Sequence, residues 1–201
     1  MLFSAFVSAS LGYIFGSIPF GLVFTRLGGL GDIRKIGSGN IGATNVLRTG
    51  RKDLAFLTLV FDIGKAGIIA LLCTFLYASP TMGFIAGTAA VIGHNYPIWL
   101  KFKGGKGVAS TLGMMLATSP MVGLCTCLTW LVVAFTLKYS SLSALVALVL
   151  SPIYALFLQK GDTEVFVLCY TFLALLSIIR HRQNIARLLN GTETKIKVKK
   201  K

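Results

Sequence analysis

The chain has 201 residues, of which 55% are hydrophobic and only 13% are charged, and its mean hydropathy is +0.78. Soluble domains carry about 25% charged residues, so this composition excludes an ordinary soluble protein and indicates a membrane protein. The formal net charge of +14 does not indicate a nucleic-acid partner, because the basic residues lie in short loops and in the C-terminal tail.

Nearly the whole chain divides into apolar segments of the length that a bilayer requires. A hydrocarbon core of about 30 Å is crossed by roughly 20 apolar residues in a helix. The segments lack the strict alternation of barrel strands, so we expect an all-α, polytopic integral membrane protein. They cover residues 3–24, 54–77, 81–100, 108–137, 140–159 and 165–179. All 4 cysteines lie inside them and are predicted to be packing residues.

The basic residues predict how these segments are oriented. Most of them lie in loop 25–53, in segment 101–106 and in the tail from Arg180, and all three groups are expected to face the cytoplasm. Dividing segment 108–137 at Thr118–Pro120 gives seven spans, with the N-terminus outside and the C-terminus inside. Proline disfavours the helical conformation in its predecessor, which supports the division. One unbroken helix there would give six spans, which is the alternative.

The loop over residues 32–49, DIRKIGSGNIGATNVLRT, is the first of three polar segments on the predicted cytoplasmic face. Its glycines permit unusual backbone angles, and its neutral amides and hydroxyls stand near a guanidinium. Hydrogen-bond donors outnumber negative charges, which suits a phosphate. The alternative is a loop that binds no ligand. The residues concerned are Gly37, Ser38, Gly39, Asn40, Gly42, Thr44, Asn45 and Arg48.

Asp62 and Lys65 lie three residues apart inside the second apolar segment. Ionisable groups at membrane depth are costly and usually face the interior of a helix bundle as a pair. We therefore predict a structural ion pair that supports loop 32–49, with a direct catalytic role as the alternative.

The second polar segment, HNYPIWLKFKGGKGVAS, covers residues 94–110. It is not a Walker A loop, because Gly107 follows Lys106 and the required first glycine is absent. A glycine turn that leads into a helix still offers free N–H groups to an anion, and Lys106 adds a positive charge. The turn contains Gly104, Gly105 and Gly107. His94 is expected to be a packing or interfacial histidine.

The third polar segment, RHRQNIARLLNGTE, covers residues 180–193. His181 and Asn184 are three residues apart and share one face of a helix. A solvated basic run beside the membrane is the alternative, but its placement on the same predicted face as the other two segments favours a shared site.

These motifs resemble those of one family, the bacterial acyl-phosphate:glycerol-3-phosphate acyltransferases called PlsY. The resemblance covers essentially the whole chain. It is carried by GSIPFG (16–21), GSGNIGATNVLR (37–48), FDIGKAG (61–67), GHNYPIWLKFKGGKGVA (93–109) and RHRQNIARLLNGTE (180–193). The three polar motifs, at 37–48, 93–109 and 180–193, stand in the right order and spacing, which makes the resemblance far more specific than a single Gly-Lys turn.

The resemblance implies a complete reaction. An acyl group passes from acyl phosphate to the 1-hydroxyl of glycerol 3-phosphate, giving lysophosphatidate and inorganic phosphate at the first step of phospholipid synthesis. The implied partners are glycerol 3-phosphate, a long-chain acyl phosphate and membrane lipids, without nucleic acid, cofactor or metal. The chain would be a single domain over residues 1–201 in the bacterial cytoplasmic (inner) membrane, with its active site on the cytoplasmic face and a flexible basic tail at 195–201.

The resemblance also assigns residues to the site. Those expected to surround glycerol 3-phosphate are Ser38, Arg48, Lys106, His181 and Asn184. Those expected to help hold the donor phosphate are Asn40, Thr44, Asn45, Gly104, Gly105 and Gly107, with Ser143 as a further substrate-binding residue.

The residues also bear on the mechanism. An acyl phosphate is already activated, so catalysis can rest on orientation and charge stabilisation. The H-x4-D base of other glycerol-phosphate acyltransferases is absent, since Trp99 and Ala186 stand where its aspartate would follow His94 and His181. We expect a substrate phosphate to accept the hydroxyl proton, with His181 as a general base in the competing version.

Two other classes of protein are weighed against this interpretation. A transporter of phosphorylated small molecules would also gather cations and glycines near the membrane, but no inverted repeat is visible and the polar segments crowd one predicted face. A purely structural membrane protein would leave the glycine-amide loops without a purpose.

Overall fold

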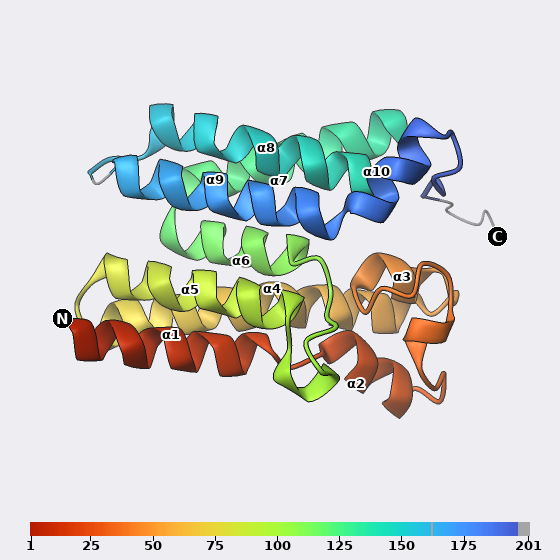
Figure 1. The fold of residues 1–201 in the computed structure, drawn as a ribbon, viewed down its shortest axis with the longest axis horizontal. Helices are drawn as coiled ribbons and strands as arrows, with labels where there is room; N and C mark the ends of the chain where they lie inside the picture. Colours follow the sequence, from red (N-terminus) through yellow and green to blue (C-terminus); the bar gives the residue numbers. More distant parts are fainter. Residues whose placement is uncertain (162, 197–201) are drawn as a thin grey trace. The chain divides into compact units, whose positions relative to one another are not determined.

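Every regular element of the residues that the computed structural model describes, 1–161 and 163–196, is a helix (Figure 1). The chain divides into two compact units, residues 1–118 and 119–201, and each is described by itself. The all-α prediction is confirmed. The prediction of a single domain over residues 1–201 stays a prediction.

The first unit holds four long helices, α1, α4, α5 and α6, and several short ones. Helix α5 packs against α1 and α4, and α4 also packs against α6. The elements are α1 (Leu2–Gly16), α2 (Phe20–Leu27), η1 (Ile33–Lys35), α3 (Ala43–Leu47), α4 (Lys52–Leu76), α5 (Pro80–Asn95), η2 (Ile98–Leu100) and α6 (Val108–Thr118).

Within residues 119–161 and 163–196, the second unit is a bundle of three long helices followed by a short one. Helix α8 packs against α7 and α9, and α10 contacts both α8 and α9. The elements are α7 (Pro120–Leu137), α8 (Ser140–Leu158), α9 (Thr163–Arg180) and α10 (Arg182–Leu189). Residues 197–201 of the tail predicted to be flexible lie outside the described residues. Lys195 and Ile196 are placed at the α7–α8 turn, where the Ile196 N–H donates to the Lys138 carbonyl at 2.7 Å.

Five segments of the described residues are long and apolar enough to cross a membrane. They are Leu2–Leu27, Lys52–Leu76, Pro120–Leu137, Ser140–Leu158 and Thr163–Arg180. Helices α5 and α6 have 16 and 11 residues, so at 1.5 Å per residue they reach only about 24 Å and about 16 Å. The chain ends one helix at Thr118 and begins the next at Pro120, which confirms the predicted break. Seven spans and their orientation stay predictions.

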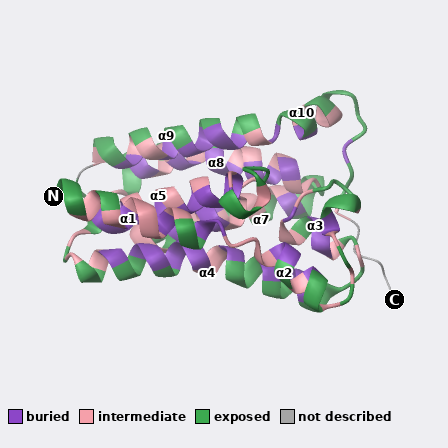
Figure 2. Cartoon of the chain, turned by 60° about the horizontal axis from the view of Figure 1, so that its bottom comes forward, coloured by how far each residue is buried: buried purple, intermediate pink, exposed green. Residues whose placement is uncertain are grey.

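Many large apolar side chains are exposed along the helices. Figure 2 shows in green where exposed residues of all types lie. Phe75, Phe135 and Phe157 expose 79%, 78% and 77% of their surface. A water-soluble protein rarely leaves so many large apolar side chains exposed. Lipid chains around the helices would cover these side chains, which agrees with the membrane protein that the composition predicts.

Small residues let helices α1 and α5 approach closely. A Cβ atom added at Gly12 would overlap the carbonyl oxygen of Ala86, and one at Gly16 would overlap that of Ala90. Close backbone contact is the usual way in which membrane helices gain packing energy, because lipid removes the hydrophobic drive between them.

A small hydrophobic cluster lies under the loop that joins α2 to α4. Leu100 of η2 packs against this cluster, so the segment after α5 reaches the base of the loop. The cluster is formed by Leu22, Ile33, Ile41, Val46, Leu54 and Ala55. Packing of this kind gives a polar loop a defined position, because its apolar residues are buried together.

Candidate active site

The loop over residues 32–49 takes its shape from the buried side chain of Asn45. Its Oδ1 accepts the Ser38 N–H at 2.9 Å, and its Nδ2 donates to the carbonyls of Ile36 at 2.9 Å and Asn40 at 2.8 Å. Asn45 is 1% exposed. A buried amide that bonds loop backbone replaces the hydrogen bonds that regular structure would supply. Asn45 therefore organises the loop, and its predicted contact with substrate stays a prediction.

Gly37 lets the side chain of Arg48 pass beside Ser38. Gly37 has a φ of 59°, which favours glycine, and a Cβ atom there would lie 3.0 Å from Arg48 Cδ and would overlap Asn45 Oδ1. Ser38 and Arg48 are both exposed. The loop thus presents a hydroxyl and a guanidinium together. In the structure the Ser38 hydroxyl donates to Asn45 Oδ1 at 3.2 Å, and it would have to turn to donate to a phosphate oxygen, for which a guanidinium is suited as it stands. Of the other predicted loop residues, Thr44 is exposed and Asn40 is half-buried.

Asp32 and Arg34 form a two-pronged ion pair at the start of the same loop. Arg34 Nε lies 2.9 Å from Oδ1 and Arg34 Nη2 lies 2.6 Å from Oδ2. The hydrogen bonds from Arg34 lower the pKa of Asp32 to about 2. Asp32 precedes the 3-10 turn η1, and its carboxylate also accepts the backbone N–H of Arg34 at 3.0 Å.

The glycine turn over residues 104–107 folds back on the end of α5. The Gly104 N–H donates to the Asn95 carbonyl at 3.2 Å, and the Gly105 N–H donates to the His94 carbonyl at 3.0 Å. These two N–H groups were predicted to bind a phosphate. In the structure they form hydrogen bonds to the end of α5. Gly107 has a φ of 78° and leads into α6.

Lys106 is the half-buried cation of this turn. The other two lysines of the segment, Lys101 and Lys103, are exposed. A lysine held against the fold at the start of α6 can direct its charge toward a bound anion, whereas exposed lysines suit the membrane interface.

A buried network of Asp62, Lys65 and His94 lies behind the turn. Lys65 Nζ stands 3.0 Å from Asp62 Oδ1, which confirms the predicted ion pair. The same ammonium donates to the Ile18 carbonyl at 2.9 Å and lies 2.9 Å from His94 Nδ1. The pair was predicted to support loop 32–49, but its hydrogen bonds run instead to the α1–α2 junction and to the end of α5.

His181 begins helix α10 in the second unit and is 2% exposed. Its Nδ1 lies 2.9 Å from the Ser177 carbonyl, so we assign the proton to Nδ1 as the donor. In the neutral ring Nε2 is then an acceptor, which suits either a base or a group that orients a substrate hydroxyl.

Glu193 connects α10 with the start of α8. Its Oε1 accepts from Ser141 Oγ at 2.7 Å and from Asn184 Nδ2 at 2.6 Å, and Arg187 Nε donates to Oε2 at 2.6 Å. Burial raises the pKa of Glu193, but these three hydrogen bonds outweigh it and leave the pKa below its usual value. The Asn184 amide is therefore held in one orientation by a charged partner.

Ser143, the remaining predicted residue, is fully buried in α8. Its hydroxyl donates to the Tyr139 carbonyl at 2.7 Å, within its own helix. The nearby hydroxyl of Ser141 instead reaches outside its helix and donates to Glu193. The predicted substrate contact of Ser143 stays a prediction.

Sequence reasoning missed the parts played by Glu193 and His94. Glu193 is the only acidic residue after Arg180, and a lone carboxylate in a basic segment could have indicated a structural partner. His94 and Lys65 are 29 positions apart, and nothing in the local pattern of either residue indicates the other.

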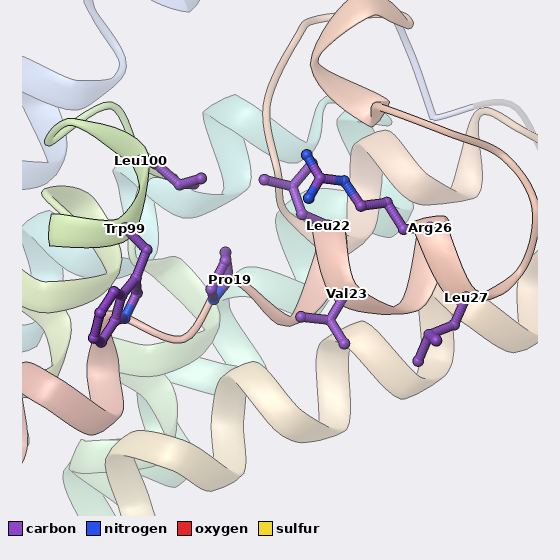
Figure 3. A pocket seen from close by; sticks show the side chains of 7 residues that line it. All are labelled: Pro19, Leu22, Val23, Arg26, Leu27, Trp99 and Leu100. Carbon is purple, nitrogen blue, oxygen red and sulfur yellow. The ribbon is translucent and has the colours of Figure 1, made fainter.

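An apolar groove of about 360 Å³ lies beside α2 in the first unit (Figure 3). Its one charged side chain is that of Arg26, and Trp99 of η2 closes one end. A groove of this composition suits an amphiphile with an anionic head. It is lined by Pro19, Leu22, Val23, Arg26, Leu27, Trp99 and Leu100.

Known proteins match this chain along nearly its whole length. The family model described as Glycerol-3-phosphate acyltransferase matches residues 6–191. A glycerol-3-phosphate acyltransferase of Rhodospirillum rubrum is 60% identical, covering 97% of this chain and 92% of that protein. One of Paramagnetospirillum magneticum is 55% identical, covering 97% and 96%.

Two solved structures have the same fold. Both are of PlsY (YgiH), described as an integral membrane glycerol 3-phosphate acyltransferase, in its glycerol 3-phosphate and lysophosphatidic acid forms. The first has a TM-score of 0.88 at 37% identity and covers 96% of both chains. The second has a TM-score of 0.85 at 38% identity and covers 96% of this chain and 95% of that one.

Proposed function

Because the chain belongs to the glycerol-3-phosphate acyltransferase family, we propose that its acyl donor is a long-chain acyl phosphate. The acyl group passes to the 1-hydroxyl of glycerol 3-phosphate and gives lysophosphatidate and inorganic phosphate. As an integral membrane acyltransferase, the protein works in phospholipid synthesis.

The observation that carries the proposal is the pairing of exposed Ser38 and Arg48 on a loop held rigid by buried Asn45. Both proposed substrates and the product lysophosphatidate carry a phosphate group, and the other product is phosphate itself. A guanidinium and a hydroxyl on a fixed backbone bind phosphate with little loss of side-chain freedom. Support for the same chemistry comes from Lys106, and from the PlsY structure in its glycerol 3-phosphate form.

In the proposed reaction the 1-hydroxyl of glycerol 3-phosphate replaces phosphate on the acyl carbon. The 1-hydroxyl oxygen attacks the acyl carbonyl carbon, the new ester bond forms, and the bond from that carbon to the phosphate oxygen breaks. Phosphate leaves with the electron pair and takes up the hydroxyl proton. Acyl phosphate needs no further activation, so the protein contributes orientation and stabilisation of negative charge.

His181 and Asn184 are proposed to orient the acceptor. The Nδ1–H of His181 is used by the Ser177 carbonyl, so its Nε2 can accept the substrate hydroxyl. The Asn184 amide is fixed by Glu193. A general base at His181 is the competing version, and the variant His181→Gln separates the two, since turnover near that of the wild type contradicts the base role.

The remaining predicted residues are proposed to bind substrate, and all of them except Ser143 are proposed to contact the donor phosphate. They are Asn40, Thr44, Asn45, Gly104, Gly105, Gly107 and Ser143. We also propose that the site faces the cytoplasm in the bacterial inner membrane, in a chain of seven spans. Support comes from the placement of Arg48 and Lys106 in basic segments, as the positive-inside rule requires.

The test uses the full chain purified in detergent or in lipid. Glycerol 3-phosphate is supplied with either palmitoyl phosphate or palmitoyl-CoA, and both phosphate release and lysophosphatidate are measured. We expect turnover with acyl phosphate alone, and its loss in Arg48→Ala and Lys106→Ala. Lys103→Ala is the matched control, because that lysine is exposed beside the turn and should leave activity unchanged. Turnover with palmitoyl-CoA would overturn the proposed donor.

A further inference from the structure

The ammonium of Lys65 indicates which nitrogen of the His94 ring carries the proton. An ammonium has three N–H donors and no acceptor, and three acceptors stand within 3.0 Å of Nζ. They are Asp62 Oδ1, the Ile18 carbonyl and His94 Nδ1. Nδ1 also stands 3.6 Å from Asp62 Oδ1. Because the ammonium can only donate, we assign Nδ1 as the acceptor in its 2.9 Å contact with Lys65, so that the proton of the neutral His94 ring is on Nε2.

The Nε2 edge of His94 occupies the place where a side chain at residue 105 would stand. A Cβ atom added at Gly105 would overlap Nε2, and it would lie 2.8 Å from Cδ2 and 2.9 Å from Cε1. Gly105 is therefore glycine because the imidazole fills its space, and its φ is not in the left-handed region. The ring and the turn are in direct contact.

Residue 62 is connected to both ends of the segment that contains the turn. Its carboxylate reaches His94 through Lys65, and its backbone carbonyl accepts the Ser110 hydroxyl at 2.9 Å. Asp62, Lys65 and His94 are 2%, 6% and 5% exposed. Water therefore has little access to this network, and its charges hold one geometry.

We propose that Asp62, Lys65 and His94 are a buried positioning device for the glycine turn, in which the His94 ring sets where Gly105 and Lys106 lie. His94 is a positioning residue and not a catalytic one. The proposal rests on the proposed role of Lys106 and this turn in binding a substrate phosphate.

A double-substitution experiment tests the contact directly. In the wild type, Gly105→Ala forces its methyl into the ring and should raise KM for glycerol 3-phosphate at least about tenfold. His94→Asn keeps an acceptor near Nδ1 for Lys65 but removes the ring edge. In that background the methyl has room, so Gly105→Ala should change KM less than about twofold.

Gly104→Ala is the matched control. Its methyl would overlap the His94 carbonyl oxygen and Pro97 Cδ, which His94→Asn does not remove. Its effect on KM should be the same in both backgrounds. If Gly105→Ala is also equally harmful in both backgrounds, the ring does not position the turn and the proposal is overturned.

If Gly105→Ala fails to fold, two variants of His94 test whether its ring positions the turn. His94→Asn retains the acceptor for Lys65 and should keep the unfolding temperature within about 5 °C while raising KM. His94→Gln places an amide near Gly105 but withdraws the acceptor, so it should lower the unfolding temperature and raise KM less. If the variant with the lower unfolding temperature also has the higher KM, His94 has a structural role only and the proposal is overturned.

A measurement of glycerol 3-phosphate binding tests the role of His94 independently of whether acyl phosphate is the donor. Glycerol 3-phosphate binding to each variant is measured by calorimetry without any donor present, and the same coupling between Gly105 and His94 is expected in Kd. A wild type that binds glycerol 3-phosphate but does not use acyl phosphate would reject the donor and leave the coupling measurable.

Discussion

Two buried carboxylates, Asp62 in the first unit and Glu193 in the second, are stabilised in different ways. Asp62 lies inside the apolar helix α4, and the opposite charge beside it is that of the equally buried Lys65. Its Oδ1 forms this ion pair at 3.0 Å, and among the described residues it makes no hydrogen bond of standard geometry.

Glu193 follows the last helix, and it is held mainly by hydrogen bonds. Two neutral side chains, those of Ser141 and Asn184, bond one oxygen, and Arg187 bonds the other at 2.6 Å. The Arg187 side chain is 36% exposed, so its own charge stays partly solvated.

The difference follows from the surroundings of each carboxylate. In an apolar span no water can solvate a charge, so Asp62 needs a full opposite charge beside it. At a helix end, neutral donors and one solvated cation are enough for Glu193. The two sites should therefore respond differently to loss of a partner, to acid and to salt.

The largest effect is expected when the buried ion pair is broken. Lys65→Met leaves the Asp62 carboxylate unpaired in the span, which should destabilise the fold by about 3–5 kcal/mol. Thermal unfolding in detergent measures it. The double variant Asp62→Leu/Lys65→Met removes both charges and should recover most of that stability. A double variant as unstable as the single one would contradict the ion-pair explanation.

Removal of the second carboxylate should have a smaller effect. Glu193→Ala leaves the Ser141 and Asn184 donors without their partner. Because water can enter the space left at this helix end, the total loss should be about 1–3 kcal/mol. Glu193→Gln keeps one acceptor oxygen and should lose less, by the same unfolding measurement. Glu164→Gln is the control, since Glu164 is exposed and should change stability little. Equal effects of Glu193→Ala and Glu164→Gln would show that the hydrogen bonds add nothing.

Acid should weaken the second site in a defined pH range. Folding lowers the pKa of Glu193 below 4.5, so its stabilisation is complete above pH 4.5 and is lost as pH falls through the folded value. The unfolding temperatures of the wild type and Glu193→Gln should therefore converge below about pH 4.5. A constant difference from pH 7 to pH 3 would rule out this linkage.

The smallest effect is expected at the exposed pair of Asp32 and Arg34. Asp32→Asn should cost less than about 1 kcal/mol, because solvated ion pairs contribute little. The loss should shrink further in 1 M salt, which shortens the screening length to about 3 Å. A large loss that is insensitive to salt would place Asp32 in the same class as Asp62.

Parts of the fold and the site could be predicted from the sequence because their signals are local. Pro120 indicated the break between two helices, and the uncharged runs indicated the apolar helices. The spacing of Asp62 and Lys65 indicated their ion pair. The family motifs indicated the acyltransferase, since whole motifs in order are rarely shared by chance.

Other parts of the site could not be predicted because they depend on contacts between distant residues. The hydrogen bonds by which buried Asn45 shapes its own loop were not part of the prediction, and its contact with substrate stays a prediction. The Gly104 and Gly105 N–H groups, expected to be free, bond the end of α5. A sequence shows which groups can form hydrogen bonds, but the fold decides which partners they meet.

The sequence by itself therefore determined a helical membrane protein with polar, phosphate-suited loops, because hydropathy and backbone preference act over neighbouring residues. Only the tertiary structure decided that Lys65 meets His94, that His94 fills the space beside Gly105, and that Glu193 holds Asn184. These contacts join residues brought together by helix packing, and packing depends on the shapes of the whole unit rather than on any local pattern.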